Sequence, residues 1–303
     1  SNFKSILLEN IKEISIKSNL NLKFDKDFKI ISYEIDGYVR NLKLQYNNYN
    51  INKSSFIYTL KNKYGEISNI SGKVNNIAFN NGKIEYADEN ETLLNIKTDI
   101  NGKIDNENIF SFLKKSQKFN FSNLEFNYIT NSSHNLDIRL DKNLKIKSYN
   151  YEIRKSSDIL KLKLKTPIKS NFLKKEIRNI EIKDINLQSS ISDSNKNDLS
   201  FKGKFNLNNS EYENISVESE FNKKSKKFLI NLSSKENVFI PILNYNNNKS
   251  QFNLTLDLTS SEKFYELKKF LFEEGKNKIK VEDFKLNKNF KIISLKNMNV
   301  ETF

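Results

Sequence analysis

The sequence predicts an all-β protein with a few short helices, in which one long antiparallel sheet carries an apolar face. Apolar and polar residues alternate along most of the 303 residues, the pattern of strands with one buried face. Six of the seven glycines stand two residues before an apolar residue, where a missing side chain lets a sheet bend strongly. Helical periodicity is confined to three short segments.

The stretches with the clearest alternation supply the candidate binding residues. Each keeps Leu, Ile, Val or Phe in one phase and polar residues in the other. Elsewhere the phase slips by one residue, as between Ile182 and Ile185, which predicts a β-bulge that returns the chain to the same face. The predicted apolar lining consists of Leu136, Ile138, Leu140, Leu160, Leu162, Leu164, Ile215, Val217, Phe221, Phe252, Leu254, Leu256 and Leu258.

The remaining elements follow from local signals. Short amphipathic helices are expected at residues 3–13, 107–116 and 261–272, the last with a Ser cap. Asn81-Gly82 between two apolar stretches predicts a hairpin turn. A nine-residue segment recurs at 25–33, 141–149 and 287–295, each copy following one expected helix, so repeat units would begin near residues 3, 107 and 261. Since no Pro-, Ser- or Gly-rich linker interrupts the pattern, residues 1–303 are expected to be one continuous segment of a longer protein.

The positive charge does not by itself predict a nucleic-acid partner. Lys and Arg total 51 against 37 Asp and Glu, a net charge of +14, but only four of the basic residues are Arg. Proteins that recognise nucleic acids depend on Arg for bidentate contacts. An excess of Lys together with about 49 Asn is typical of A+T-rich codon usage, and we expect no nucleic-acid binding.

No constellation of residues predicts catalysis. The chain has no Cys, which excludes thiolate metal sites and Cys nucleophiles. His134 is the only histidine and lies in a polar run, Asn131–Asn135, that predicts an exposed hairpin turn. The acidic run at 88–91 is expected to be a solvated loop, and the run at 193–198 lacks the Gly and Glu of a calcium loop. We therefore expect no enzyme activity, no metal and no cofactor.

The apolar face itself is the remaining candidate for function. It could pack on a second sheet in a sandwich, close into a barrel, or line a strongly coiled open groove that holds lipid acyl chains. Alternation alone does not separate these three architectures. The open groove accounts for the uninterrupted pattern and the absence of catalytic residues, and a β-sandwich is the alternative.

The chain resembles a known family. The similarity lies in strand entries such as Gly72-Lys73-Val74 and Gly102-Lys103-Ile104 and in the later stretches at 121–126 and 182–187. In these segments the chain is similar to the AsmA-like proteins of Gram-negative bacteria, the TamB and YhdP type. The resemblance implies a periplasmic repeating β-groove, an inner-membrane anchor outside this sequence, and carriage of phospholipid acyl chains between the inner and outer membranes. The alternative is a non-enzymatic β-sandwich or β-solenoid module of a secreted or surface protein.

Overall fold

The computed structural model describes residues 10–46, 49–75, 77–88, 91–105, 124–170, 172–193, 197–222, 224–240, 243–247 and 250–302. The predicted fold class is confirmed: strands make up 82% of the structure and helix 1%, and the large antiparallel sheet is not closed into a barrel. The chain divides into two compact units, residues 1–119 with 129–155 and residues 120–128 with 156–303. We describe each unit by itself.

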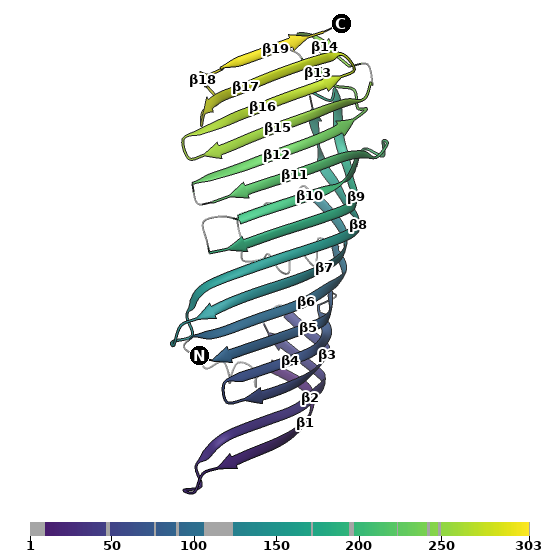
Figure 1. Cartoon of the computed structure of the whole chain (residues 1–303). Helices are drawn as coiled ribbons and strands as arrows, with labels where there is room; N and C mark the ends of the chain where they lie inside the picture. Colours follow the sequence, from purple (N-terminus) through teal and green to yellow (C-terminus); the bar gives the residue numbers. More distant parts are fainter. Residues whose placement is uncertain are drawn as a thin grey trace. The chain divides into compact units, whose positions relative to one another are not determined.

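Unit 1 is a ladder of antiparallel strands in sequence order (Figure 1). Each strand from β1 to β6 pairs with the next one along the chain. Parts of β7 and β8 belong to this unit and the other parts belong to unit 2. The strands are β1 (Ile11–Phe24), β2 (Ile30–Tyr46), β3 (Tyr49–Lys61), β4 (Tyr64–Val74), β5 (Ile77–Asp88), β6 (Thr92–Asp105), β7 (Leu124–Leu140) and β8 (Ile146–Ser170).

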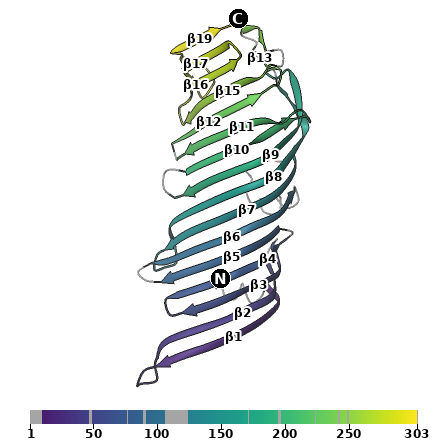
Figure 2. The same ribbon diagram turned by 45° about the vertical axis from the view of Figure 1, so that its right-hand side comes forward.

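Unit 2 continues the same plan (Figure 2). Its ladder runs β9–β10–β11–β12–β15–β16–β17, and β17 also pairs with β18 and β19. Between β12 and β15 the chain leaves the ladder and forms a two-stranded sheet, β13 with β14. The strands are β9 (Lys175–Ser192), β10 (Asn197–Leu207), β11 (Glu213–Phe221), β12 (Ser225–Ser234), β13 (Phe239–Ile240), β14 (Tyr245–Asn246), β15 (Phe252–Ser261), β16 (Phe264–Glu274), β17 (Asn277–Asn287), β18 (Ile292–Ser294) and β19 (Asn297–Glu301).

A line of β-bulges crosses unit 1. In each of the neighbouring strands β2 to β5 one residue takes a positive φ near 50°, at Asn41, Lys53, Asn69 and Asn81. The strand register shifts at each of these positions. A bulge bends its strand and increases the local twist, so the aligned bulges bend the sheet along one line. The predicted bulge between Ile182 and Ile185 is present in unit 2, where Asp184 has φ 53° beside a register shift.

Two local predictions are wrong. Residues 261–272 are not a helix: they form the end of β15 and most of β16, because their apolar residues pair across the sheet with those of β15 and β17. Asn81-Gly82 is not a hairpin turn but lies inside β5, because the left-handed conformation of Asn81 serves a bulge. The helix expected at 107–116 lies outside the described residues, as do residues 3–9 of the first expected helix, whose residues 11–13 belong to β1.

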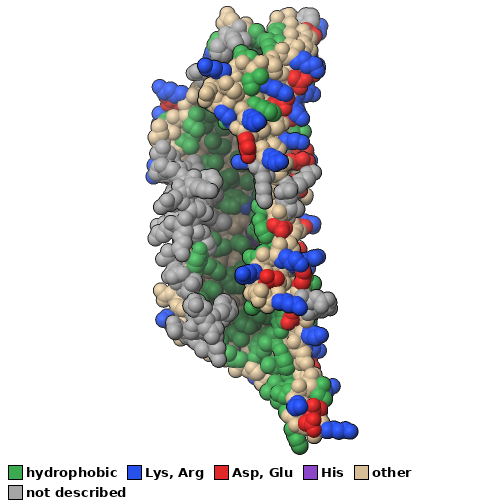
Figure 3. Space-filling model, turned by 90° about the vertical axis from the view of Figure 1, so that its left-hand side faces the viewer, with side chains coloured by type: hydrophobic (Ala, Val, Ile, Leu, Met, Phe, Trp, Pro, Cys, Tyr) green, Lys and Arg blue, Asp and Glu red, His purple; other side chains and the backbone are tan. Residues whose placement is uncertain are grey.

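One face of the sheet is hollowed and apolar. Figure 3 shows hydrophobic side chains gathered in a hollow and charged side chains along the rim on its right. Among the described residues, the only sheet besides the large one is β13–β14. A sandwich would require a second sheet of comparable width to cover this face, and the described residues supply no such sheet for most of it.

Candidate functional site

The apolar face of unit 2 is built from rows of paired residues. Because residues directly opposite each other on antiparallel strands share a face, the register identifies each row. We call the longest one the apolar row; it crosses eight strands through Leu187, Phe201, Val217, Ile230, Leu256, Phe270, Val281 and Met298. Seven steps of about 4.8 Å between strands give this row a length of about 34 Å. That length exceeds the thickness of one bilayer leaflet's hydrocarbon layer, about 15 Å.

Seven of the thirteen predicted lining residues lie on this face. Those of β11 (Ile215, Val217 and Phe221) and β15 (Phe252, Leu254, Leu256 and Leu258) are joined through β12, with Ile215 and Leu254 both paired to Leu232. The opposite face carries a polar ladder in which Thr255 donates a hydrogen bond of 3.0 Å to Asn231. The two faces of the same strands therefore differ sharply in polarity.

The other six predicted residues lie on β7 and β8. Leu160, Leu162 and Leu164 are half-buried and alternate with the exposed Lys161, Lys163 and Lys165 in unit 2. In unit 1, Leu136, Ile138 and Leu140 are also half-buried. The predicted alternation is therefore clear in β8, whereas in β7 only Arg139 of the intervening residues is exposed.

Sequence reasoning missed the contribution of β16 and β17. Phe270 and Phe272 of β16 pair with Val281 and Ile279 of β17 and extend the apolar face by two strands. Phe270 and Phe272 fall in the segment expected to be a helix. Lys268 lies at a register irregularity between Leu267 and Lys269, and this extra residue changes the spacing of apolar residues from two to three. Gly275, with φ 55° in the turn after β16, is the signal that could have identified a hairpin.

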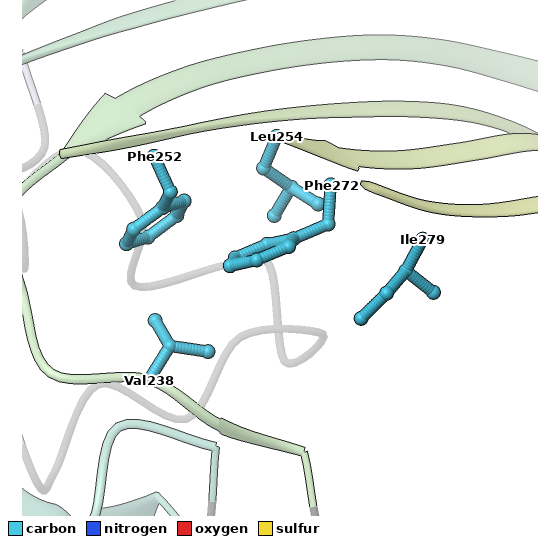
Figure 4. Close-up of a cluster of buried hydrophobic side chains, with 5 residues drawn as sticks. All are labelled: Val238, Phe252, Leu254, Phe272 and Ile279. Atoms are coloured by element: carbon cyan, nitrogen blue, oxygen red, sulfur yellow. The ribbon is translucent and has the colours of Figure 1, made fainter. Parts of the chain in front are cut away.

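One end of the face is closed by a cluster of fully buried side chains (Figure 4). The rings of Phe252 and Phe272 stack with centroids 5.1 Å apart, and Val238 reaches them from the segment between β12 and β13. Phe252, Phe272 and Val238 are 0% exposed, and Leu254 is 8% exposed. Phe252 and Leu254 are therefore core positions in this structure, whereas Val217 and Leu256 are only partly covered.

A buried asparagine holds the covering segment in place. The Asn247 side chain accepts a hydrogen bond of 2.7 Å from the Val238 backbone N–H and donates to the Glu236 carbonyl at 2.9 Å. The Phe239 N–H donates to the Phe172 carbonyl at 2.7 Å, which ties β13 to the turn between β8 and β9. These bonds satisfy backbone groups that would otherwise be buried without partners.

The face of unit 1 is also apolar. Tyr58, Ile67, Ile84 and Ile96 form a cross-strand row over β3 to β6. Beside it, Gly65 pairs with Tyr86, and a Cβ at Gly65 would lie 1.9 Å from the Tyr86 ring. Gly65 thus provides the space that the aromatic ring occupies.

A polar cluster interrupts the apolar phase of β7 and β8 in unit 1. His134 is not in an exposed turn, as expected, but within β7, where its Nε2 lies 2.8 Å from Ser132 Oγ and its Nδ1 lies 2.5 Å from Tyr151 Oη. Lys155 Nζ donates to Thr130 Oγ1 at 3.2 Å and Lys155 is only 8% exposed. The turn prediction failed because β7 continues through this polar run.

Burial sets the protonation of this cluster. Desolvation lowers the pKa of Lys155 to about 8. Desolvation also lowers the pKa of His134, partly offset by the charge of Asp99, so His134 is neutral at pH 7. His134 also lines a pocket with the charged residues Lys97, Asp99, Glu152 and Arg154, so the surroundings of the cluster are polar.

The acidic segments do not form a metal site in the described part of the chain. No group of three or more His, Asp or Glu residues there is close enough to hold a metal ion. Asp88 is exposed and Glu91 forms an ion pair with Lys147; residues 89–90 and 194–196 of the acidic runs lie outside the description.

No family model, curated protein or solved structure matches the chain. Among the described residues there is also no helix with the length and hydropathy needed to cross a membrane.

Proposed function

We propose that the hollowed apolar face binds lipid acyl chains. The observation that carries this proposal is the apolar row, which crosses eight strands and is only partly covered. An acyl chain removes apolar surface from water at about 25 cal/mol per Å², and it needs no hydrogen bonds from the face that receives it. A large exposed apolar patch on a soluble protein marks a binding site.

We further propose that the chain is a segment of an AsmA-like bridge that carries phospholipid through the periplasm between the inner and outer membranes, held by an inner-membrane anchor outside this sequence. The open, antiparallel, sequentially paired sheet is consistent with such a groove. The protein has no enzymatic role in this proposal, because the face serves as a surface along which a lipid moves. No cofactor is required.

Substitution of the apolar row tests the proposal. The wild-type chain, purified from cells and extracted with organic solvent, should yield bound phospholipid by mass spectrometry. Val217→Asp should reduce the bound lipid at least about tenfold, because a carboxylate on the face cannot be desolvated by an acyl chain without a large cost. Ser216→Asp, one residue away on the polar face, is the matched control and should retain the lipid.

The same experiment separates the groove from a closed module. Circular dichroism should show that Val217→Asp and Leu162→Asp keep their strands, since the strand ladder continues through both positions. Absence of lipid in the wild-type protein, together with unfolding of both variants, would mean that the face is a closed core and would favour a β-sandwich or β-solenoid binding module.

A further inference from the structure

Three hairpin turns share one hydrogen-bonding pattern and one unusual feature. They lie at residues 25–29, 141–145 and 287–291, and we call them the tips. In each, the first residue donates its N–H to the carbonyl of the fifth and accepts a backbone hydrogen bond from the fourth. The Oδ1 of Asp25, Asp141 or Asn287 also accepts hydrogen bonds of 2.8–3.0 Å from two backbone N–H groups of its own turn. The recurring sequence thus folds into one recurring turn.

The fourth residue of each tip has a backbone conformation that its side chain disfavours. Phe28, Leu144 and Phe290 have φ of 60°, 59° and 58°, a region that a bulky residue enters only at a cost. Elsewhere in the described residues this conformation falls on Asn, Asp and Gly, such as Asn208 with φ 57° and Gly275 with φ 55°, apart from Lys53 and Lys174. Since Asn is abundant in the chain, an apolar residue at all three tips is not explained by the needs of the turn.

The same three side chains are exposed. Phe28 is 87%, Leu144 69% and Phe290 70% exposed, although Phe290 stacks on one side against Tyr265. Ile30, Ile146 and Ile292 follow two residues later and are exposed as well. Each tip is therefore unfavourable in two ways: the backbone of its fourth residue is strained, and its apolar side chains are exposed to water.

Lysines flank every apolar tip residue. The pairs are Lys26 and Lys29, Lys142 and Lys145, and Lys288 and Lys291, and none of the six forms an ion pair with another described residue. The third residue of the tip is Asp27 in the first copy and Asn in the other two. The formal net charge is therefore 0 at 25–29, +1 at 141–145 and +2 at 287–291, and the attraction to an anionic surface is strongest at the last tip. Lys288 has further side-chain contacts: its Nζ lies 3.8 Å from the centre of the Tyr265 ring and donates a hydrogen bond of 3.4 Å to Ser260 Oγ. An apolar residue flanked by two cations is complementary to the boundary of an anionic bilayer, where acyl chains lie beneath phosphate groups.

The position of the tips in each unit leaves them accessible. In unit 1, β1–β2 and β7–β8 connect at the same edge of the ladder, as Figures 1 and 2 both show. In unit 2, the tip at 287–291 connects β17 to β18 at the edge away from the buried cluster, since Phe272 and Ile279 lie next to the turn at the other end of β17. No covering segment among the described residues reaches a tip.

We propose that each of the three tips is a docking element for the surface of an anionic phospholipid bilayer. Phe28, Leu144 and Phe290 enter the boundary between headgroups and acyl chains, and the flanking lysines contact the phosphates. The tips are distinct from the apolar row, and their use does not depend on whether the row binds lipid.

Vesicle binding tests the proposal with a triple variant. Phe28→Asn, Leu144→Asn and Phe290→Asn combined remove the apolar side chains while keeping a residue that tolerates positive φ. The wild-type chain should sediment with vesicles of phosphatidylcholine and phosphatidylglycerol, and the triple variant should bind at least about tenfold more weakly. The control combines Ile57→Thr, Leu93→Thr and Ile168→Thr, exposed apolar positions outside the tips, and should bind as the wild type does.

The charge and the depth of insertion are tested separately. Lys→Gln at the six tip lysines should reduce binding to that found with pure phosphatidylcholine vesicles. Because the chain has no Cys, a single Phe290→Cys can be labelled with an environment-sensitive dye, which should shift to the blue on the anionic vesicles. The proposal is overturned if the wild type does not bind these vesicles, if the triple variant binds equally well, or if the dye shows no shift; binding of the tips to a protein alone would give the same negative results.

Discussion

At the scale of single residues, the stacked pair Phe252 and Phe272 dominates the closed end of unit 2. Both rings are fully buried beneath Val238, so Phe252→Ala should lower the free energy of unfolding by about 3–5 kcal/mol. Val217→Ala on the partly covered apolar row should lower the free energy of unfolding by clearly less. Chemical denaturation followed by circular dichroism measures both, and equal losses would mean that the row is as closely packed as the cluster.

Lys155 makes stability depend on pH. Its pKa is about 8 in the folded protein against about 10.4 in an unfolded chain, so the unfolded state binds more protons between these values and stability rises with pH across that window. Below pH 8 the buried Lys155 is charged in the folded protein, and its desolvation lowers the free energy of unfolding by up to about 3 kcal/mol. Lys155→Met should therefore stabilise the protein most below pH 8, with a gain that shrinks toward pH 10.5. A gain that does not change with pH would contradict the lowered pKa.

At the scale of elements, the bulges determine how the strands bend. Asn69 sits in the left-handed region at a register shift, so Asn69→Gly should be neutral or slightly stabilising, whereas Asn69→Ala should cost about 1 kcal/mol. Thermal unfolding of the two variants gives the comparison. If both variants lose the same stability, the Asn69 side chain rather than its backbone conformation is what the bulge requires.

Most strands could be predicted from the sequence, but several bulges and the covering segment could not. Alternation identifies the strands and the apolar phase because the side-chain period of a strand is two, and the phase slip at Ile182 and Ile185 reveals a bulge correctly. Bulges also hide the strands at Asn81-Gly82 and at Lys268 from sequence patterns, since a bulge and a turn use the same residues and a bulge breaks the period of two. The burial of Phe252 was not predictable, because the residue that covers it, Val238, comes from an irregular segment without periodicity.

At the scale of the whole molecule, the charge is spread over many weak interactions. The ion pairs are mostly exposed, such as Lys61 with Glu34 and Lys204 with Asp184, and pairs of this kind contribute little to stability. Binding to random DNA should accordingly be weak and should disappear at moderate salt, since only non-specific phosphate contacts are available. Fluorescence anisotropy across a salt series measures this, and salt-resistant, sequence-selective binding would show that the lysines have a specific role.

The sequential pairing of the strands has a consequence for how the chain folds. In the registered ladders, nearly every strand pairs with the one before it, so most strand pairings join neighbouring segments of the chain. The hydrogen bond between Phe239 and Phe172 is an exception that joins distant segments. Structure can then grow from any nucleated hairpin toward either end, as in linear repeat proteins. A nascent chain that emerges gradually can add one strand at a time. A substitution that disrupts one strand would stop growth at that strand, while the strands already formed would stay folded.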